Sequence, residues 1–159
     1  MTKTPSQSPH ILVLHGPSLG ALGEREPAIY GTTRLAEIDR ALAALATDLG
    51  ATIECRQSNH VGVLIDWLLA AAGEGFRGIL INPAAYAHTS LALADALRAI
   101  GPPAVEVHLT NTAAREPCRQ LSLTAAACRA VVAGFGPDGY YLGLRGLVEH
   151  LRGFTAAAK

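Results

Sequence analysis

The sequence predicts an α/β protein built on a five-stranded parallel sheet with helices on both of its faces. Short β-type apolar runs alternate along the chain with longer Ala- and Leu-rich segments, and most of the short runs are continuously apolar. Continuous runs are typical of parallel strands buried on both faces, and strand–helix–strand units join such strands through right-handed crossovers. The 159 residues are enough for one domain with a buried core.

Five apolar runs supply the expected strands: 11–14, the neighbourhood of Ile53, 79–81, 105–109 and 130–133. Four longer segments supply the expected helices: 35–49, 61–72, 90–100 and 139–151. In the first helix, leucine and isoleucine recur at three- and four-residue steps, and Gly50 follows as a C-cap. We expect a single domain over 11–153, with loose tails at 1–10 and 154–159.

Composition excludes several classes of function. The chain carries 13 Lys+Arg against 13 Asp+Glu, so its net charge of zero argues against a broad electrostatic grip on nucleic acid or an anionic membrane. No apolar stretch approaches the roughly 20 residues that cross a bilayer, and no secretory signal is visible. The cysteines Cys55, Cys118 and Cys128 show neither paired nor metal-ligand spacing. We therefore expect a cytoplasmic protein without a metal, and little charge repulsion opposes its self-association.

Polar and glycine-rich segments follow the predicted strands. They are 15–31 after the first, 56–60 after the second and 82–90 after the third. Open parallel sheets bind ligands beyond the carboxyl ends of their strands, so the sequence predicts a site at this edge.

The first of these segments lacks GxGxxG and GxxxxGK[ST], which disfavours a nucleotide or flavin site. It does hold Arg25 and Tyr30, five residues apart. An arginine beside a phenol stabilises the phenolate, which can act as a general base. The alternative is that Tyr30 simply packs and Arg25 is solvated.

Glu106 and His108 alternate along the fourth strand, so their side chains share one face. A carboxylate stabilises a protonated imidazole and orients it as a proton donor. The alternative is a paired carboxylate in the core.

Three further side chains are candidates with equally plain alternatives. His88 lies just before Thr89 or Ser90, either of which can cap the next helix, so it can belong to the capping turn. Arg115 and Arg119 share a face if their segment is helical and can then grip a carboxylate, or they are surface charges.

Six stretches carry a resemblance to one family: GEREPAIYG, RQSNH, LIDW, INPAAYAHTS, EVHLTN and AREPCR, in this order. Together they resemble the type II 3-dehydroquinate dehydratases over 11 to about 151. The resemblance implies a flavodoxin-like fold, no cofactor, and trimers grouped into dodecamers in which Asp95 reaches a neighbouring subunit's site. It also implies conversion of the small-molecule substrate 3-dehydroquinate to 3-dehydroshikimate, in aromatic biosynthesis (the shikimate pathway) or in quinate catabolism.

The resemblance also implies roles for single residues. Tyr30 would take a proton from carbon 2 of the substrate, with Arg25 holding it ionised. His108 would protonate the departing hydroxyl at carbon 1, with Glu106 orienting its ring. The substrate would be bound by the side chains of Asn82, His88 and Arg119 and by the backbone N–H groups of Leu109 and Thr110.

The chain departs from the family pattern at several positions. Ser18 stands where the family has an asparagine that holds an ordered water beside the developing enolate. Losing an oxyanion donor elsewhere costs about 10²–10³ in rate, so we expect slower dehydration or a repositioned water. A catalytically weakened or substrate-shifted paralogue that acts in binding or assembly is the alternative. Whether 20–31 forms an ordered lid stays open. The other departures are Gly20, Val61, Val63, Ala113, Pro117, Cys118, Gln120 and Leu121.

Overall fold

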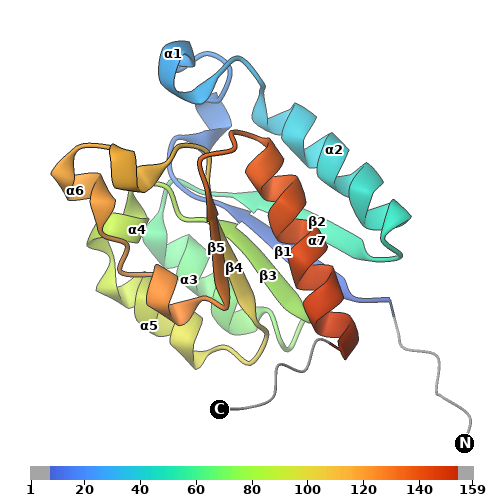
Figure 1. Ribbon diagram of the computed structural model, residues 1–159. Coiled ribbons are helices and arrows are strands. Elements are labelled where there is room, and N and C mark those ends of the chain that lie inside the picture. The colour runs from blue at the N-terminus through green and yellow to red at the C-terminus, as the bar shows by residue number, and fades with distance from the viewer. Residues whose placement is uncertain (1–7, 154–159) are drawn as a thin grey trace, which may run out of the picture.

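Five parallel strands lie between two layers of helices in the computed structural model, which describes residues 8–153 (Figure 1). The strand order is β2-β1-β3-β4-β5, and the predicted fold class is confirmed. β1 begins at His10, inside the tail expected at 1–10, and the rest of both expected tails lies mostly outside the described residues. The strands are β1 (His10–His15), β2 (Thr52–Gln57), β3 (Gly78–Asn82), β4 (Ala104–His108) and β5 (Ala130–Ala133).

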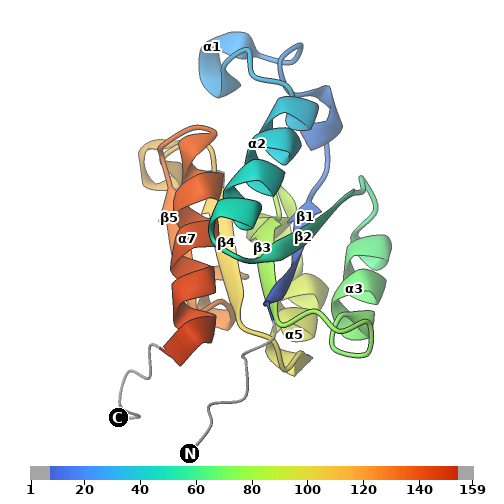
Figure 2. The ribbon, with the colours of Figure 1, turned by 90° about the vertical axis from the view of Figure 1, so that its right-hand side faces the viewer.

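The four predicted helices are present, with ends that differ from the prediction by a residue or two. Figure 2 shows one pair on each face of the sheet. The pair α2 (Leu35–Asp48) and α7 (Asp138–Gly153) covers one face, and the pair α3 (Val61–Ala70) and α5 (Leu91–Ala99) covers the other. Short helices in the connections are η1 (Leu19–Ala21), α1 (Pro27–Tyr30), α4 (Tyr86–Thr89), η2 (Thr112–Ala114), α6 (Pro117–Gln120) and η3 (Ala125–Ala127).

The sheet divides the core into two layers. Along β1, Ile11 and Val13 pack among the side chains of α2 and α7, whereas Leu12 and Leu14 pack among those of α3 and α5. All four are fully buried, and each such side chain stabilises the fold by about 1.5–3 kcal/mol. Burial on both faces explains why the central strands are continuously apolar.

Local signals define the helix ends as predicted. Gly50 follows α2 in the left-handed region at φ +62°, where a side chain would be strained. Ser90 caps α5, because its hydroxyl accepts the Leu93 N–H at 3.0 Å. Among residues 8–153, no helix combines the length and the apolar character that a membrane crossing needs.

The strand register aligns the ends that carry polar side chains. His15, at the end of β1, pairs with Gln57 on one side and with Asn82 on the other. Beyond it, the Gly16 N–H donates to the Asn82 carbonyl at 2.8 Å. A Cβ at Gly16 would lie 2.6 Å from the Pro83 carbonyl oxygen, so only glycine lets these two connections approach so closely.

Candidate active site

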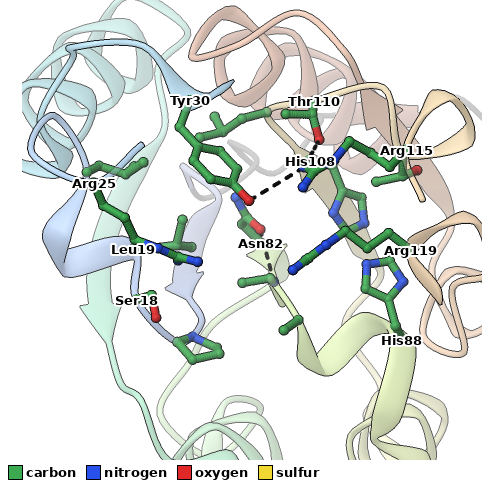
Figure 3. A pocket seen from close by; sticks show the side chains of 16 residues that line it. Ser18, Leu19, Arg25, Tyr30, Asn82, His88, His108, Thr110, Arg115 and Arg119 are labelled. Atoms are coloured by element: carbon green, nitrogen blue, oxygen red, sulfur yellow. Dashed lines mark hydrogen bonds between the residues drawn. The ribbon is translucent and has the colours of Figure 1, made fainter. Parts of the chain in front are cut away.

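A pocket of about 750 Å³, its open mouth included, lies at the carboxyl edge of the sheet (Figure 3). Its walls come from the first loop, from the segment after β3, and from the end of β4 with the connection that follows. The lining includes ten residues singled out by the sequence: Ser18, Arg25, Tyr30, Asn82, His88, His108, Leu109, Thr110, Arg115 and Arg119. Glu106 lies behind the wall and Asp95 lies elsewhere.

The imidazole of His108 is held from behind by Glu106. The ring Nε2 donates to Glu106 Oε1 at 2.6 Å, so the expected shared face of β4 is confirmed. Glu106 is fully buried and accepts hydrogen bonds from two hydroxyls, Ser122 Oγ at 2.8 Å and Thr124 Oγ1 at 2.5 Å, as well as a long one from the Cys128 thiol at 3.9 Å. Neither hydroxyl could be linked to Glu106 from the sequence, because both follow β4 by more than a dozen residues and no motif connects them to it.

These contacts decide the charge of Glu106. Burial raises the pKa of its carboxyl, but the hydrogen bonds from His108 and the two hydroxyls outweigh burial, and the net pKa lies below the usual value. The carboxylate is therefore ionised at neutral pH and fixes the ring that donates to it. Nearby, burial and then the charge of Glu106 raise the pKa of the Cys128 thiol to about 12, which keeps that thiol protonated.

Tyr30 ends helix α1 and points its hydroxyl into the pocket (Figure 3). Arg115 Nη1 lies 3.5 Å from that hydroxyl and 3.2 Å from Thr110 Oγ1. The Arg25 guanidinium lies 5.6 Å from the centroid of the Tyr30 ring and pairs with Glu26. In this arrangement Arg115, rather than Arg25, contacts the oxygen of Tyr30.

Arg115 and Arg119 are held by one carboxylate between them. Glu116 accepts from Arg119 Nε at 2.7 Å and from Arg115 Nε at 3.2 Å. Its own backbone N–H and then these arginines lower the pKa of Glu116 to about 2. Only Arg119 lies in α6, so the two arginines do not share a face of one helix, the arrangement expected if their whole segment were helical.

The base of the pocket is built from the end of β3 and from α4. Asn82 is buried, and its Oδ1 accepts the Ala84 N–H at 3.1 Å. His88 bonds the Leu121 carbonyl through Nδ1 at 2.7 Å, and its ring stacks 6.1 Å from that of His108. Asn82 and the two imidazoles therefore present polar groups on one side of the pocket.

Ser18 and Asp95 are exposed, unlike the buried groups of the β4 side. Ser18 lines the pocket in the left-handed region at φ +64°, and its N–H donates to Asn59 Oδ1 at 2.9 Å. That conformation strains a residue with a Cβ. Asp95 lies on α5, pairs with Arg98 at 2.9 Å and does not line the pocket.

The fold and the pocket define a flavodoxin-like α/β protein in which a phenol and a carboxylate-held imidazole share one pocket, with arginines beside them, and side chains of these types can act in acid–base chemistry. Such a site suits a small polar anion that exchanges protons on two sides.

Comparison with known proteins identifies the family. The family model described as dehydroquinase class II matches residues 9–148, and this chain belongs to that family. It is 52% identical to a 3-dehydroquinate dehydratase of Rhodopseudomonas palustris (strain BisA53), over 93% of this chain and 97% of that protein. It is 54% identical to that of Geotalea daltonii, over 89% and 98% of the two chains. The crystal structure of type II dehydroquinase from Propionibacterium acnes superposes with a TM-score of 0.85 at 41% identity, covering 90% of this chain and 98% of that one.

Proposed function

We propose that the protein dehydrates 3-dehydroquinate to 3-dehydroshikimate. One observation carries the proposal: Tyr30 and His108 line the same pocket, and a buried, ionised carboxylate stands behind the imidazole. The relatives at 52% and 54% identity bear the name 3-dehydroquinate dehydratase, which supports the choice of substrate.

The reaction is a trans elimination through an enolate. The Tyr30 phenolate takes the proton from carbon 2, and the electron pair of that C–H bond delocalises onto the neighbouring ketone oxygen. The enolate then collapses, the bond from carbon 1 to its hydroxyl breaks, and His108 gives that oxygen a proton, so water leaves. Arg115, within 3.5 Å of the Tyr30 hydroxyl, stabilises the phenolate, and Arg25 adds positive charge over the ring.

The substrate offers two kinds of polar group, a carboxylate and ring hydroxyls, and different parts of the pocket bind each kind. The backbone N–H groups of Leu109 and Thr110, at the end of β4, bind the carboxylate. The side chains of Asn82, His88 and Arg119 bind the ring hydroxyls. Each lines the pocket, so all of them can reach one ring-sized molecule together.

An ultraviolet assay tests the proposal directly. 3-Dehydroshikimate is a conjugated enone and absorbs, whereas 3-dehydroquinate does not, so the purified protein should produce a rise in absorbance. Cys118→Ala changes an exposed thiol outside the pocket lining and should leave the rise intact. No rise at high protein concentration, for the wild type and for Ser18→Asn alike, overturns the proposal.

The weakened-paralogue alternative gives a different result in the same assay. It predicts no rise with the wild-type protein and a rise with Ser18→Asn, because the asparagine supplies a longer donor for the enolate water. A rise with both variants favours the dehydratase.

We also propose that the protein is a cytoplasmic homo-oligomer, a dodecamer of trimers, in which Asp95 completes the pocket of a neighbouring subunit. Asp95 lies on α5 with its side chain largely exposed, outside the pocket of its own chain. Light scattering coupled to size exclusion measures the assembly, and Asp95→Ala should raise KM more than it lowers kcat. A monomer with full activity contradicts this arrangement.

A further inference from the structure

A second cluster of chemically reactive side chains lies outside the pocket. His15 ends β1, Cys55 lies near the end of β2, and Asp39 lies on α2 above them. One ring nitrogen of His15, the Sγ of Cys55 and a carboxylate oxygen of Asp39 all lie within 4.8 Å of one another. Among residues 8–153 no other group of three or more possible metal ligands comes this close, and none of the three lines the pocket.

The three ligand atoms are a nitrogen, a sulfur and an oxygen. Mg²⁺ and Ca²⁺ demand several oxygen ligands, and this cluster offers one carboxylate. Zn²⁺ accepts imidazole, thiolate and carboxylate together in a tetrahedron, with water as the fourth ligand. The donor set therefore selects a borderline-soft cation of the Zn²⁺ class.

The spacing of the ligand atoms is close to what such a cation needs. His15 Nε2 lies 2.8 Å from Asp39 Oδ1 as a hydrogen bond. Around Zn²⁺, with bonds of about 2.0–2.1 Å, these two atoms would stand about 3.3 Å apart. Asp39 can make that small outward shift because its side chain is 32% exposed, and the same exposure admits water to the site.

The imidazole is already oriented from behind. His15 is fully buried, and its Nδ1 lies 2.8 Å from the hydroxyl of Tyr140, which is itself fully buried on α7. Metal-binding histidines characteristically use their second nitrogen in this way, which fixes the ring and leaves the other nitrogen for the metal. With a cation at Nε2, the ring proton sits on Nδ1 and is donated to the Tyr140 oxygen.

We propose that His15, Asp39 and Cys55 form a binding site for one divalent cation of the Zn²⁺ class. A cation is bound by the thiolate and not by the thiol, so binding at Cys55 displaces the thiol proton. Zn²⁺ affinity therefore rises with pH. The sequence shows no metal-ligand spacing, because these three residues meet only in the folded chain.

Cobalt provides the probe, because thiolate-bound Co²⁺ gives a charge-transfer absorption in the near ultraviolet. The full-length protein, treated with a chelator and dialysed, is titrated with Co²⁺ and then with Zn²⁺, and Zn²⁺ is also titrated by calorimetry. The expected result is a band that saturates at one Co²⁺ per chain, disappears on Zn²⁺ addition, and forms more tightly as pH rises. A wild-type protein with no such band and no Zn²⁺ heat has only a hydrogen-bonded cluster, and the proposal fails.

Variants decide which thiol and which imidazole bind. Cys55→Ser should abolish the band, and His15→Asn should weaken Zn²⁺ binding by about tenfold or more. Cys118→Ser, which removes an exposed thiol elsewhere, is the matched control and should keep the band. A band that persists in Cys55→Ser belongs to another thiol and overturns the assignment. The wild-type titration stands on its own if a variant folds poorly.

Discussion

The two sides of the pocket are built in opposite ways. On the β4 side, Glu106 is fully buried and receives three hydrogen bonds of 2.5–2.8 Å, and His108 is 6% exposed. On the first-loop side, Tyr30 is only half-buried and its hydroxyl has one long hydrogen bond, 3.5 Å from Arg115, while Ser18 is exposed. The proposed acid, His108, is thus pre-organised by the sheet, whereas the proposed base, Tyr30, is carried on a loop segment that can adjust around a ligand.

The largest expected effect tests the adjustable side. Tyr30→Phe keeps the ring and its packing but removes the hydroxyl proposed to accept the proton, so kcat should fall by about 10³-fold. KM should change little, because the other binding groups remain. Steady-state kinetics separate the two constants, and wild-type turnover would remove Tyr30 from the mechanism.

The next effect tests the rigid side. His108→Ala removes the imidazole proposed to protonate the leaving hydroxyl, and kcat should fall by about 10²-fold or more. His150, which lies near the end of α7 and outside the pocket, offers a control in His150→Ala with unchanged kcat. A rate near wild type in His108→Ala would mean that the acid is another group.

The hydrogen bonds that Glu106 accepts behind the His108 ring can be removed one at a time. Thr124→Val keeps the shape of the side chain but deletes the hydroxyl that donates to Glu106 at 2.5 Å. A hydrogen bond to a charged group contributes about 1.5–3 kcal/mol, so the free energy of unfolding should fall by about 2 kcal/mol in denaturant melts. Thr47→Val, which loses an exposed hydroxyl bond on α2, should change it by less than about 0.5 kcal/mol.

The same pair of variants should differ in acid. Because the folded protein lowers the pKa of Glu106 below its unfolded value, its contribution to stability is present at neutral pH. That contribution is lost as pH falls through the folded pKa. Thr124→Val raises the folded pKa, so its acid loss should begin at a higher pH than in the wild type. Coincident acid profiles of the two proteins would show that this hydroxyl does not hold the carboxylate.

The smallest effect concerns Ser18. Asparagine adopts the left-handed conformation more readily than serine, so Ser18→Asn should stabilise the fold by about 0.5 kcal/mol. Its amide also reaches further, and kcat should rise by about tenfold if a water at this position stabilises the enolate. Ser18→Gly relieves the strain without adding a donor, so it should gain stability alone. An equal gain in rate from both variants would trace the effect to the backbone.

The sequence predicts the sheet and the strand ends well, because buried parallel strands and amphipathic helices leave local patterns. The Glu106–His108 contact follows from the two-residue period of a strand, and the structure confirms it. Other contacts have no local pattern. Arg115 reaches Tyr30 across 85 positions, and Thr124 reaches Glu106 across 18 positions, so only the folded chain brings them together. The sequence shows that Ser18 departs from the family pattern. Its strained left-handed backbone, at φ +64°, is known only from the structure.

The close approach at Gly16 has a consequence for engineering. A Cβ at Gly16 would lie 2.6 Å from the Pro83 carbonyl oxygen. The connections that follow β1 and β3 therefore pack directly against each other where they leave the sheet. New specificities are therefore best sought by exchanging residues beyond this junction and before Arg25, in 18–24, while the junction itself is left untouched. A library that randomised Gly16 would mostly sample misassembled proteins rather than new catalysts.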